Sequence, residues 1–403
     1  MAANSPTQND LNKRLDEAAQ TGDAAELAAL LALGADPAAG DSKALCLASA
    51  HGRLACVKLL IPLCDPTAKK SQALVEASRG GHVDCVNLLI PVSDPKARSS
   101  AALCAAAQEG HAECVELLIP ASDPKSSSSF ALSAAICHGH ADCARLLLPV
   151  SGPVDTHSLL QAASRSGHAD CVKLLIPTSS PKGYGSHPLR LAAENGQADC
   201  VKLLIPVSNP KDRDSHALAF AAANGHVECV KLLIPVSDHA DAGSTALLWA
   251  AENGRVECVK LLAPFSSLAR DVFRPLRAAA ERGQADVLLF LAPLFASTAE
   301  HSKALCLAAE NGHADCVNIL IPTSDPAANH SQALHLAAAN GHAECIQALA
   351  SSSNSLEYSS AIETAIAHCR FDCARLLSSL AEQQCLSTSI ADASPANPRT
   401  LRI

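Results

Sequence analysis

A unit of about 29 residues recurs along nearly the whole chain, from Leu11 to about Leu380. Its clearest copy reads Gly-His-Ala-Asp-Cys-Val-Lys-Leu-Leu-Ile-Pro at Gly167–Pro177 and follows a Ser-x-Ala-Leu-x-x-Ala-Ala pattern. Neighbouring marks of the period lie 29 residues apart, except for two gaps of 28. The marks are Cys56, Cys85, Cys114, Cys143, Cys171, Cys200, Cys229, Cys258, Val287, Cys316, Cys345 and Cys373. A repeat this regular predicts a solenoid, whose function resides in one long surface.

The copy at Ser71–Pro95 shows what each unit is expected to form. A first short helix is predicted over Gln72–Gly80, and Ser71 is expected to cap it by accepting from the first turn of backbone. Gly81 can adopt the left-handed conformation that ends the helix. A second helix is predicted over His82–Ile90, because the proline that follows cannot continue the hydrogen bonding. The unit is therefore a helix-turn-helix.

The unit resembles the ankyrin repeat. The twelfth copy, QALHLAAANGHAECI at Gln332–Ile346, is closest to the family pattern Thr-Pro-Leu-His-x-Ala. Parts of the pattern also stand at His187–Leu189 and Thr245–Leu247, and Gly34–Pro37 is similar to the family's turn after the second helix. The resemblance implies an all-α, ankyrin-like solenoid of about 13 helix-turn-helix repeats. The family's unit has about 33 residues, so the projecting hairpin loops are expected to be truncated to tight turns.

A leucine-rich repeat is the alternative fold, since its unit has a similar length. That fold needs a strand of the form Leu-x-x-Leu-x-Leu, which no copy shows, and Ala-Ala followed by a glycine fits a helix better. We expect a flexible N-terminus over residues 1–10, the solenoid over 11–380, and a disordered C-terminal tail over 381–403. The copy around 361–377 has Cys369 in place of glycine and is expected to cap the array. The irregular stretch 270–297 is either a repacked unit or a second contact surface.

The chain has 18 cysteines. Equivalent residues of stacked helix pairs lie about 8–10 Å apart, whereas a disulfide needs Cα atoms within about 7 Å. The repeat cysteines are therefore interpreted as small buried hydrophobic residues of a reducing, cytoplasmic protein. Three others, Cys137, Cys369 and Cys385, are expected to be more exposed.

Composition and motifs exclude several classes of function. The net charge of −9 disfavours nucleic-acid binding, no apolar run is long enough to cross a membrane, and the first residues have no secretory pattern. No phosphate loop, GxSxG or HExxH motif is present, so we expect no enzyme, cofactor or metal site. The histidine that follows the helix-ending glycine is replaced by Arg53, Gln197, Arg255 or Gln284 in other copies, so we expect it to bond local backbone.

Helix geometry identifies a candidate binding face. In the first helix, the Leu of Ala-Leu and the two alanines three and four residues later face the core, while positions two and five after that Leu point away from it. In an ankyrin-like stack this outward side lines the concave groove. Position two is apolar and position five acidic in the middle and late copies. The partner-binding residues predicted on this basis are Leu191, Glu194, Phe220, Trp249, Glu252, Glu281, Leu307, Glu310 and Leu336.

We expect a monomer that binds a protein partner along this groove through a segment with apolar side chains beside lysines or arginines, centred on Phe220 and Trp249. The alternative is that both rings only cover a thin alanine core. Two other roles stay open: a secreted bacterial effector that binds host proteins, and an adaptor that recruits substrates for a separate enzyme.

Overall fold

The protein is an all-helical solenoid, as the repeat predicts. The computed structural model describes residues 7–238, 242–265, 273–350 and 355–392, which contain 26 α-helices and no strand. Each copy supplies two helices, joined by a short turn at the helix-ending residue. The first helices of the copies are α1 (Gln8–Thr21), α3 (Ala39–Ala50), α5 (Ala68–Arg79), α7 (Ala97–Glu109), α9 (Ser126–Cys137), α11 (Thr156–Ser166), α13 (Gly183–Glu194), α15 (Asp212–Asn224), α17 (Ala242–Glu252), α19 (Arg274–Glu281), α21 (Thr298–Glu310), α23 (Ala328–Asn340) and α25 (Ser355–Ala367).

The second helices are shorter, and α26 is the exception. Their bounds are α2 (Ala24–Ala32), α4 (Leu54–Leu60), α6 (Val83–Leu89), α8 (Ala112–Leu118), α10 (Ala141–Leu147), α12 (Ala169–Leu175), α14 (Ala198–Leu204), α16 (Val227–Leu233), α18 (Val256–Leu262), α20 (Ala285–Leu291), α22 (Ala314–Leu320), α24 (Ala343–Ala350) and α26 (Phe371–Asp392). In α6 the helix ends at Leu89, and a 3₁₀ turn over Ile90–Val92 follows because Pro91 has no amide proton to donate. The second helix is thus shorter than the predicted His82–Ile90.

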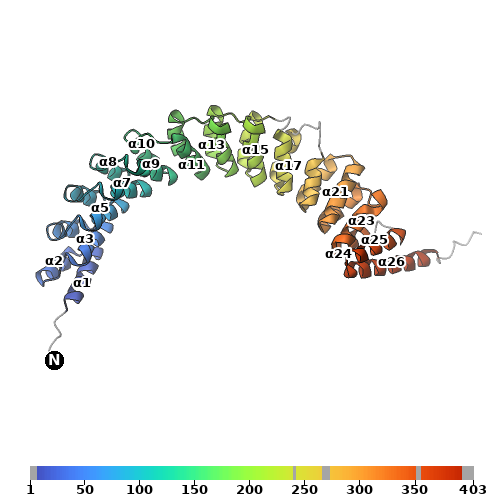
Figure 1. The fold of residues 1–403 in the computed structure, drawn as a ribbon, viewed down its shortest axis with the longest axis horizontal. Helices are drawn as coiled ribbons and strands as arrows, with labels where there is room; N and C mark the ends of the chain where they lie inside the picture. The colour runs from blue at the N-terminus through green and yellow to red at the C-terminus, as the bar shows by residue number, and fades with distance from the viewer. Residues whose placement is uncertain (1–6, 239–241, 266–272, 351–354, 393–403) are drawn as a thin grey trace, which may run out of the picture. The chain divides into compact units, whose positions relative to one another are not determined.

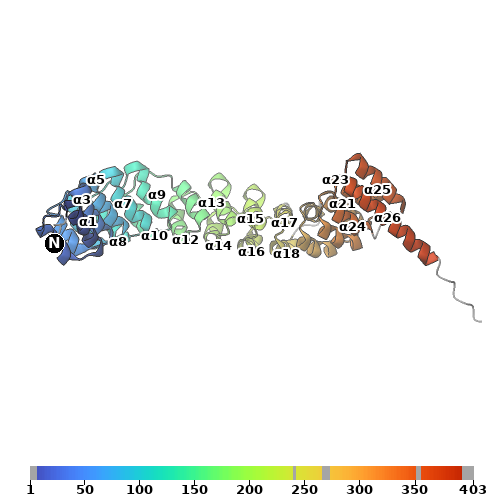
Figure 2. The same ribbon diagram turned by 90° about the horizontal axis from the view of Figure 1, so that it is seen from below.

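Contacts divide the chain into two units, Met1–Ala192 with Lys202–Ser208, and Ala193–Val201 with Asn209–Ile403. We call them the N-terminal and the C-terminal unit. Within each unit the first helices stack on one another in one row and the second helices in another, from α1 to α12 and from α15 to α26. Figure 1 shows the helix pairs following one another in chain order, and Figure 2 shows the two rows, for example α3, α5 and α7 beside α8 and α10.

The core lies between the two rows and is built from small and medium side chains. In the copy formed by α5 and α6, Leu74, Ala77, Cys85 and Val86 are each at most 1% exposed. All eleven cysteines that mark the repeat are buried free thiols, which confirms their interpretation as core residues. The exposed cysteines Cys137 and Cys369 also lie as predicted, while the side chain of Cys385 lies outside the described residues.

The predicted capping role of Ser71 is wrong. Lys69, Lys70 and Ser71 have positive φ angles of 49°, 60° and 63°, so the regular right-handed helix of α5 begins only after them. The Ser71 hydroxyl accepts a hydrogen bond from the backbone N–H of Asp94, 2.8 Å away in the turn of the next copy. The same bond recurs at 2.8 Å between Ser100 and the N–H of Asp123. The repeated serine therefore joins successive layers, a role that its helix-starting position could not reveal.

The histidine after the helix-ending glycine joins layers at the opposite end of the first helices. Except at His140, its Nε2 donates to a backbone carbonyl of the preceding copy, not to local backbone as expected from the sequence. The distances are 3.0 Å for His82 to Ala50, 2.9 Å for His111 to Arg79 and 3.0 Å for His313 to Glu281. Arg53, Arg255 and Gln284 make the same bond to Gln20, Ala223 and Glu252. These side chains replace one another because each can present an N–H donor.

Both ends of the array differ from the predicted boundaries. Helix α1 begins at Gln8, where Thr7 and Asp10 form a capping box, so only residues 1–6 precede the first described element and they lie outside the described residues. Helix α26 extends to Asp392, through residues where a disordered tail is predicted. Ala381, Glu382, Gln383 and Gln384 are good helix formers and favour its continuation past residue 380. Residues 393–403 lie outside the described residues.

The irregular stretch 270–297 is described from residue 273 onward. It forms α19 and α20, and the rings of Phe273 and Phe295 pack edge to face with their centroids 5.5 Å apart. Val287 takes the place of the repeat cysteine and is fully buried. The stretch thus forms a copy of the repeat that carries a pair of half-buried phenylalanines, Phe273 and Phe295.

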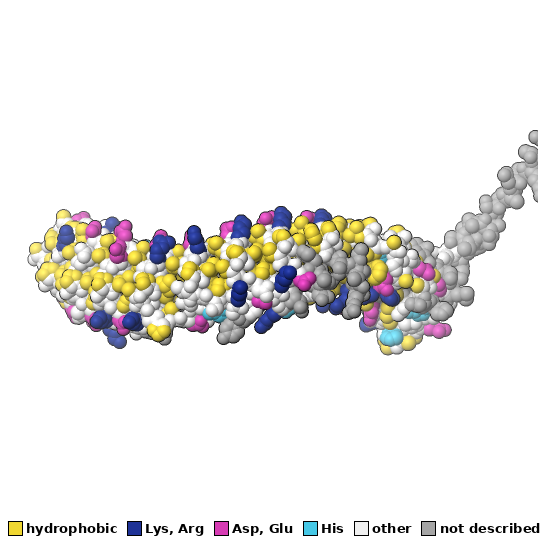
Figure 3. Space-filling view, turned by 90° about the horizontal axis from the view of Figure 1, so that it is seen from above, with side chains coloured by type: hydrophobic (Ala, Val, Ile, Leu, Met, Phe, Trp, Pro, Cys, Tyr) yellow, Lys and Arg dark blue, Asp and Glu magenta, His cyan; other side chains and the backbone are white. Residues whose placement is uncertain are grey.

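Apolar side chains also reach the surface. Leu33 and Leu63 in the N-terminal unit are 66% and 50% exposed. On one face of this unit hydrophobic side chains form a band, with lysines, arginines and acidic residues along its borders (Figure 3). Among the described residues, no helix combines the length and the apolar character that a membrane span needs.

Candidate functional site

Two of the predicted binding residues form an aromatic cluster on the first helices of the C-terminal unit. The rings of Phe220 (α15) and Trp249 (α17) pack edge to face with centroids 5.3 Å apart. His216, one turn before Phe220, completes the cluster at 6.0 Å from Phe220 and 6.3 Å from Trp249. Both predicted rings are only partly buried. The cluster therefore packs α15 against α17 and still exposes aromatic surface. It is compatible with both interpretations of the sequence, a partner-binding site and a cover for the alanine core.

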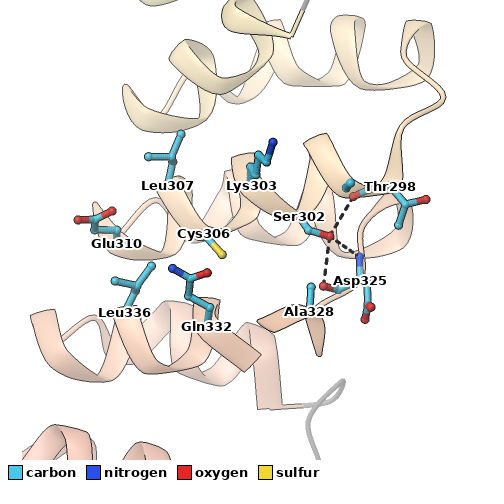
Figure 4. A pocket seen from close by; sticks show the side chains of 11 residues that line it. Thr298, Ser302, Lys303, Cys306, Leu307, Glu310, Asp325, Ala328, Gln332 and Leu336 are labelled. Carbon is cyan, nitrogen blue, oxygen red and sulfur yellow. Dashed lines mark hydrogen bonds between the residues drawn. The ribbon is translucent and has the colours of Figure 1, made fainter. Parts of the chain in front are cut away.

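Three further predicted residues line a groove between α21 and α23. The groove has a volume of about 670 Å³, and Leu307, Glu310 and Leu336 lie along it. Figure 4 shows Leu336 and Gln332 on α23 facing Glu310 and Cys306 on α21. Cys306 and Gln332 were not predicted, although each stands next to an Ala-Leu core pair and so belongs to an outward edge of its helix. The groove is apolar at its centre and polar at its ends.

The turn end of this groove is closed by ion pairs and hydrogen bonds. Glu300 binds Lys303 at 2.7 Å and Arg277, from α19, also at 2.7 Å. The Lys303 hydrogen bond is the main reason why the pKa of Glu300 lies below its usual value. The Ser302 hydroxyl accepts from the N–H of Asp325 at 2.9 Å (Figure 4). Because Lys303 is already paired, its charge is offset within the protein.

The opposite end of the groove carries the acidic side chain of Glu310. Glu281 and Glu310 occupy equivalent positions on α19 and α21 and are exposed. No residue in the described part of the chain forms an ion pair with either of them. Burial raises the pKa of the nearby Cys306 thiol, and the negative charge of Glu310 raises it further. The free end of the groove is therefore negative, and its cysteine is a neutral thiol.

The remaining predicted residues are placed less favourably. Leu191 is only 4% exposed, so its expected outward position is wrong, and it lies in the N-terminal unit, whereas Phe220 lies in the other. Glu194 and Glu252 are half-buried. The asparagines that follow these acidic positions bond backbone, since Asn253 donates to the Trp249 carbonyl at 2.8 Å and Asn311 to the Leu307 carbonyl at 2.9 Å. These amide groups satisfy carbonyls in the last turn of their own helices, so those N–H groups are already used as donors.

The structure describes no cluster of three or more His, Cys, Asp or Glu side chains that could hold a metal ion in residues 7–238, 242–265, 273–350 and 355–392. The repeat cysteines are buried, and burial raises the pKa of Cys114, Cys171 and Cys316 to about 11. These thiols are therefore protonated at neutral pH and are poor nucleophiles. What the described residues of the C-terminal unit provide is an exposed aromatic cluster and the groove between α21 and α23.

A family model for ankyrin repeats in groups of three copies matches residues 15–99, 92–156, 151–214, 189–271, 218–300 and 305–387. The chain belongs to the ankyrin-repeat family. Repeats of this family are generally protein–protein interaction modules, and its members are typically non-enzymatic scaffolds. A comparison with curated proteins gave no match. The unit of 29 residues therefore represents a shortened ankyrin repeat, in which the left-handed turn over Lys69–Ser71 leads directly into the first helix.

Proposed function

We propose that this ankyrin-repeat protein is a scaffold that binds a segment of a partner protein on the first-helix face of its C-terminal unit. The segment carries apolar side chains flanked by lysine or arginine. The groove between α21 and α23 is the observation that carries the proposal, because it joins an apolar centre formed by Leu307 and Leu336 to the unpaired carboxylate of Glu310.

The aromatic cluster extends the proposed surface along the same row of helices. Phe220 and Trp249 are large, rigid and partly exposed, which is the character of the anchors that dominate binding energy in protein interfaces. Glu252, Glu281 and Glu310 recur one per layer at the same position of successive first helices. A partner with cations at a matching spacing would meet one carboxylate in each layer, and such complementarity favours one orientation of binding.

The proposed setting is a reducing, cytoplasmic one, in which the protein acts as a monomer and without a cofactor. The free thiol state of the buried cysteines supports this setting, since the core is built from unoxidised cysteine side chains. The role is binding and not catalysis, as the protonated thiols and the contact surface of the C-terminal unit indicate.

The test uses a displayed library of random dodecapeptides, selected on the full chain. We expect the retained peptides to combine apolar side chains with Lys or Arg, and to bind the Phe220→Ala/Trp249→Ala variant more weakly by about 2 kcal/mol or more. A charge-reversed Glu281→Lys/Glu310→Lys variant should lose the same peptides. Leu289→Ser, an exposed leucine on α20 outside the proposed face, is the matched control. Equal binding by all folded variants would refute the proposed face.

A further inference from the structure

The N-terminal unit has a groove of its own on the first helices α5, α7 and α9, with a volume of about 400 Å³. We propose that this second groove binds a segment of a partner protein in which an Asp or Glu side chain stands next to an aromatic or large aliphatic side chain. It goes beyond the function proposed above, because the groove lies in a different unit and has the opposite charge.

The groove exists because side-chain size changes at one repeated position. Gln72, Ala101 and Phe130 are spaced 29 residues apart and occupy the same place on α5, α7 and α9. The small side chain of Ala101 between two large ones leaves the space, and Cys104 and Ala105 line it as well. Ala101 lies on the outward side of α7 and is not fully buried. The space beside it is therefore open to solvent and is not a cavity within the core.

A chain of hydrogen bonds holds two arginines along one side of the groove. Arg98 donates to Gln72 Oε1 at 2.9 Å, Gln72 donates to Glu76 Oε1 at 2.5 Å, and Arg79 donates to Glu76 Oε2 at 2.6 Å. Glu76 thus offsets the charge of Arg79. Arg98 bonds only a neutral amide among the described residues, so its positive charge is available to a ligand.

A comparison with the preceding layer shows why Arg98 lacks an acidic partner. One repeat earlier the equivalent residue is Lys69, whose Nζ lies 3.7 Å from an oxygen of Asp41. The residue equivalent to Asp41 in the next copy is Lys70. The pair that closes the edge between α3 and α5 is therefore replaced by two cations, Lys70 and Arg98, both exposed. The two positive charges, on α5 and α7, favour the binding of a carboxylate from a ligand. An arginine can bind a carboxylate with two parallel hydrogen bonds.

Phe130 supplies the apolar part of the site. It is 53% exposed, which makes it a large hydrophobic side chain left open to solvent beside the groove. Covering its ring with an apolar side chain of a ligand would remove water from both surfaces. The far end of the groove holds Gln108, which donates to the Glu109 carboxylate at 3.2 Å. The acidic side chain of the ligand should therefore lie at the Arg98 end.

The experiment selects displayed random dodecapeptides that the full-length wild-type chain retains and an Ala101→Phe variant, whose groove is filled, does not. Affinities are then measured by fluorescence anisotropy. We expect the selected peptides to contain Asp or Glu beside Phe, Trp, Leu or Ile, and their affinity to fall by about tenfold or more for Arg98→Gln and on raising the salt concentration. Leu63→Ser removes an exposed side chain elsewhere in the same unit and should leave affinity unchanged.

Several outcomes would overturn the proposal. One is a selected pool without acidic residues, and another is an Arg98→Gln variant that is folded by circular dichroism and binds like the wild type. Equal peptide binding by the wild type and the Ala101→Phe variant would also overturn it. Self-association in sedimentation that Ala101→Phe abolishes would assign the groove to a second copy of the chain instead. The Phe220→Ala/Trp249→Ala variant should bind these peptides normally, so this test and that of the proposed function fail independently.

Discussion

The Nε2 atom of His111 lies 2.9 Å from the carbonyl oxygen of Arg79 in the preceding repeat. A carbonyl can only accept, so the histidine donates. The acceptor belongs to the last turn of α5, where backbone carbonyls have no partner within their own helix. One side chain thus completes the hydrogen bonding of one layer and fixes the position of the next.

Removal of this donor should destabilise the array. His111→Ala leaves the Arg79 carbonyl without its partner, and we expect the free energy of unfolding to fall by about 1 kcal/mol. His111→Gln should retain most of the stability, because Gln284 makes the same bond to the Glu252 carbonyl at 3.2 Å. Urea unfolding followed by circular dichroism measures both. A glutamine variant as unstable as the alanine variant would show that ring packing, and not the hydrogen bond, is responsible.

The glycine that ends α5 should be coupled to the same histidine. Gly81 has a φ of +71°, and a Cβ atom placed on it would lie 2.5 Å from His111 Nδ1. We expect Gly81→Ala to cost about 1 kcal/mol or more in stability through both the strained backbone and the clash. The cost should be smaller in a His111→Ala background, because only the backbone strain remains. A double-mutant cycle measures the coupling, and strictly additive losses would contradict the predicted clash.

The left-handed turn at the start of α5 predicts that glycine is more stable than alanine at position 70. Lys70 has a φ of 60° although it lies within the bounds of α5. Glycine adopts this conformation readily, whereas other residues pay about 1–2 kcal/mol. Lys70→Gly should therefore be more stable than Lys70→Ala, by about 1 kcal/mol. A regular helix would give the reverse order, so thermal unfolding of the two variants decides between the conformations.

The buried thiols should make stability depend on alkaline pH. Burial raises the pKa of Cys114 to about 11 from an ordinary value of 9.0. The contribution of this thiol to stability is complete below pH 9, where both states are protonated. It is lost as the pH rises from 9 towards 11, because the unfolded state ionises first.

A valine variant isolates this effect. Val287 occupies the same position in its own copy and is fully buried, so Cys114→Val should fold with little loss of stability at pH 7. Between pH 8 and pH 10.5 the wild type should lose on the order of 1 kcal/mol more than the variant. Urea midpoints at the two pH values give the difference. Identical pH profiles would mean that the thiol does not titrate as its burial predicts.

The solenoid, its helix pairs and the buried cysteines could be predicted from the repeat, because each core position recurs in every copy. The roles of Ser71 and His111 could not. Both side chains bond backbone atoms of a neighbouring copy, at separations of 23 and 32 residues, and spacing within one unit contains no information about the register of stacking. Leu191 was misplaced for a similar reason, since its burial depends on surroundings that helix periodicity does not specify.

The candidate site was anticipated in part. Periodicity placed Leu307, Glu310 and Leu336 on one face, and the structure shows them along one groove. It did not predict where a groove opens, because a hollow depends on size differences between equivalent residues of adjacent layers. The step from Gln72 through Ala101 to Phe130 is such a difference, and it becomes visible only when copies are compared at a single position.

The inter-layer hydrogen bonds end on main-chain atoms, the N–H of Asp94 and the carbonyl of Arg79. Every amino acid has a main-chain carbonyl, and every one except proline has a main-chain N–H. These bonds therefore place little restriction on which residues occupy the two positions. If whole repeats were duplicated or deleted, the repeats that become adjacent would therefore still form these hydrogen bonds. The number of repeats could then change by gain or loss of whole units without any new joining residue.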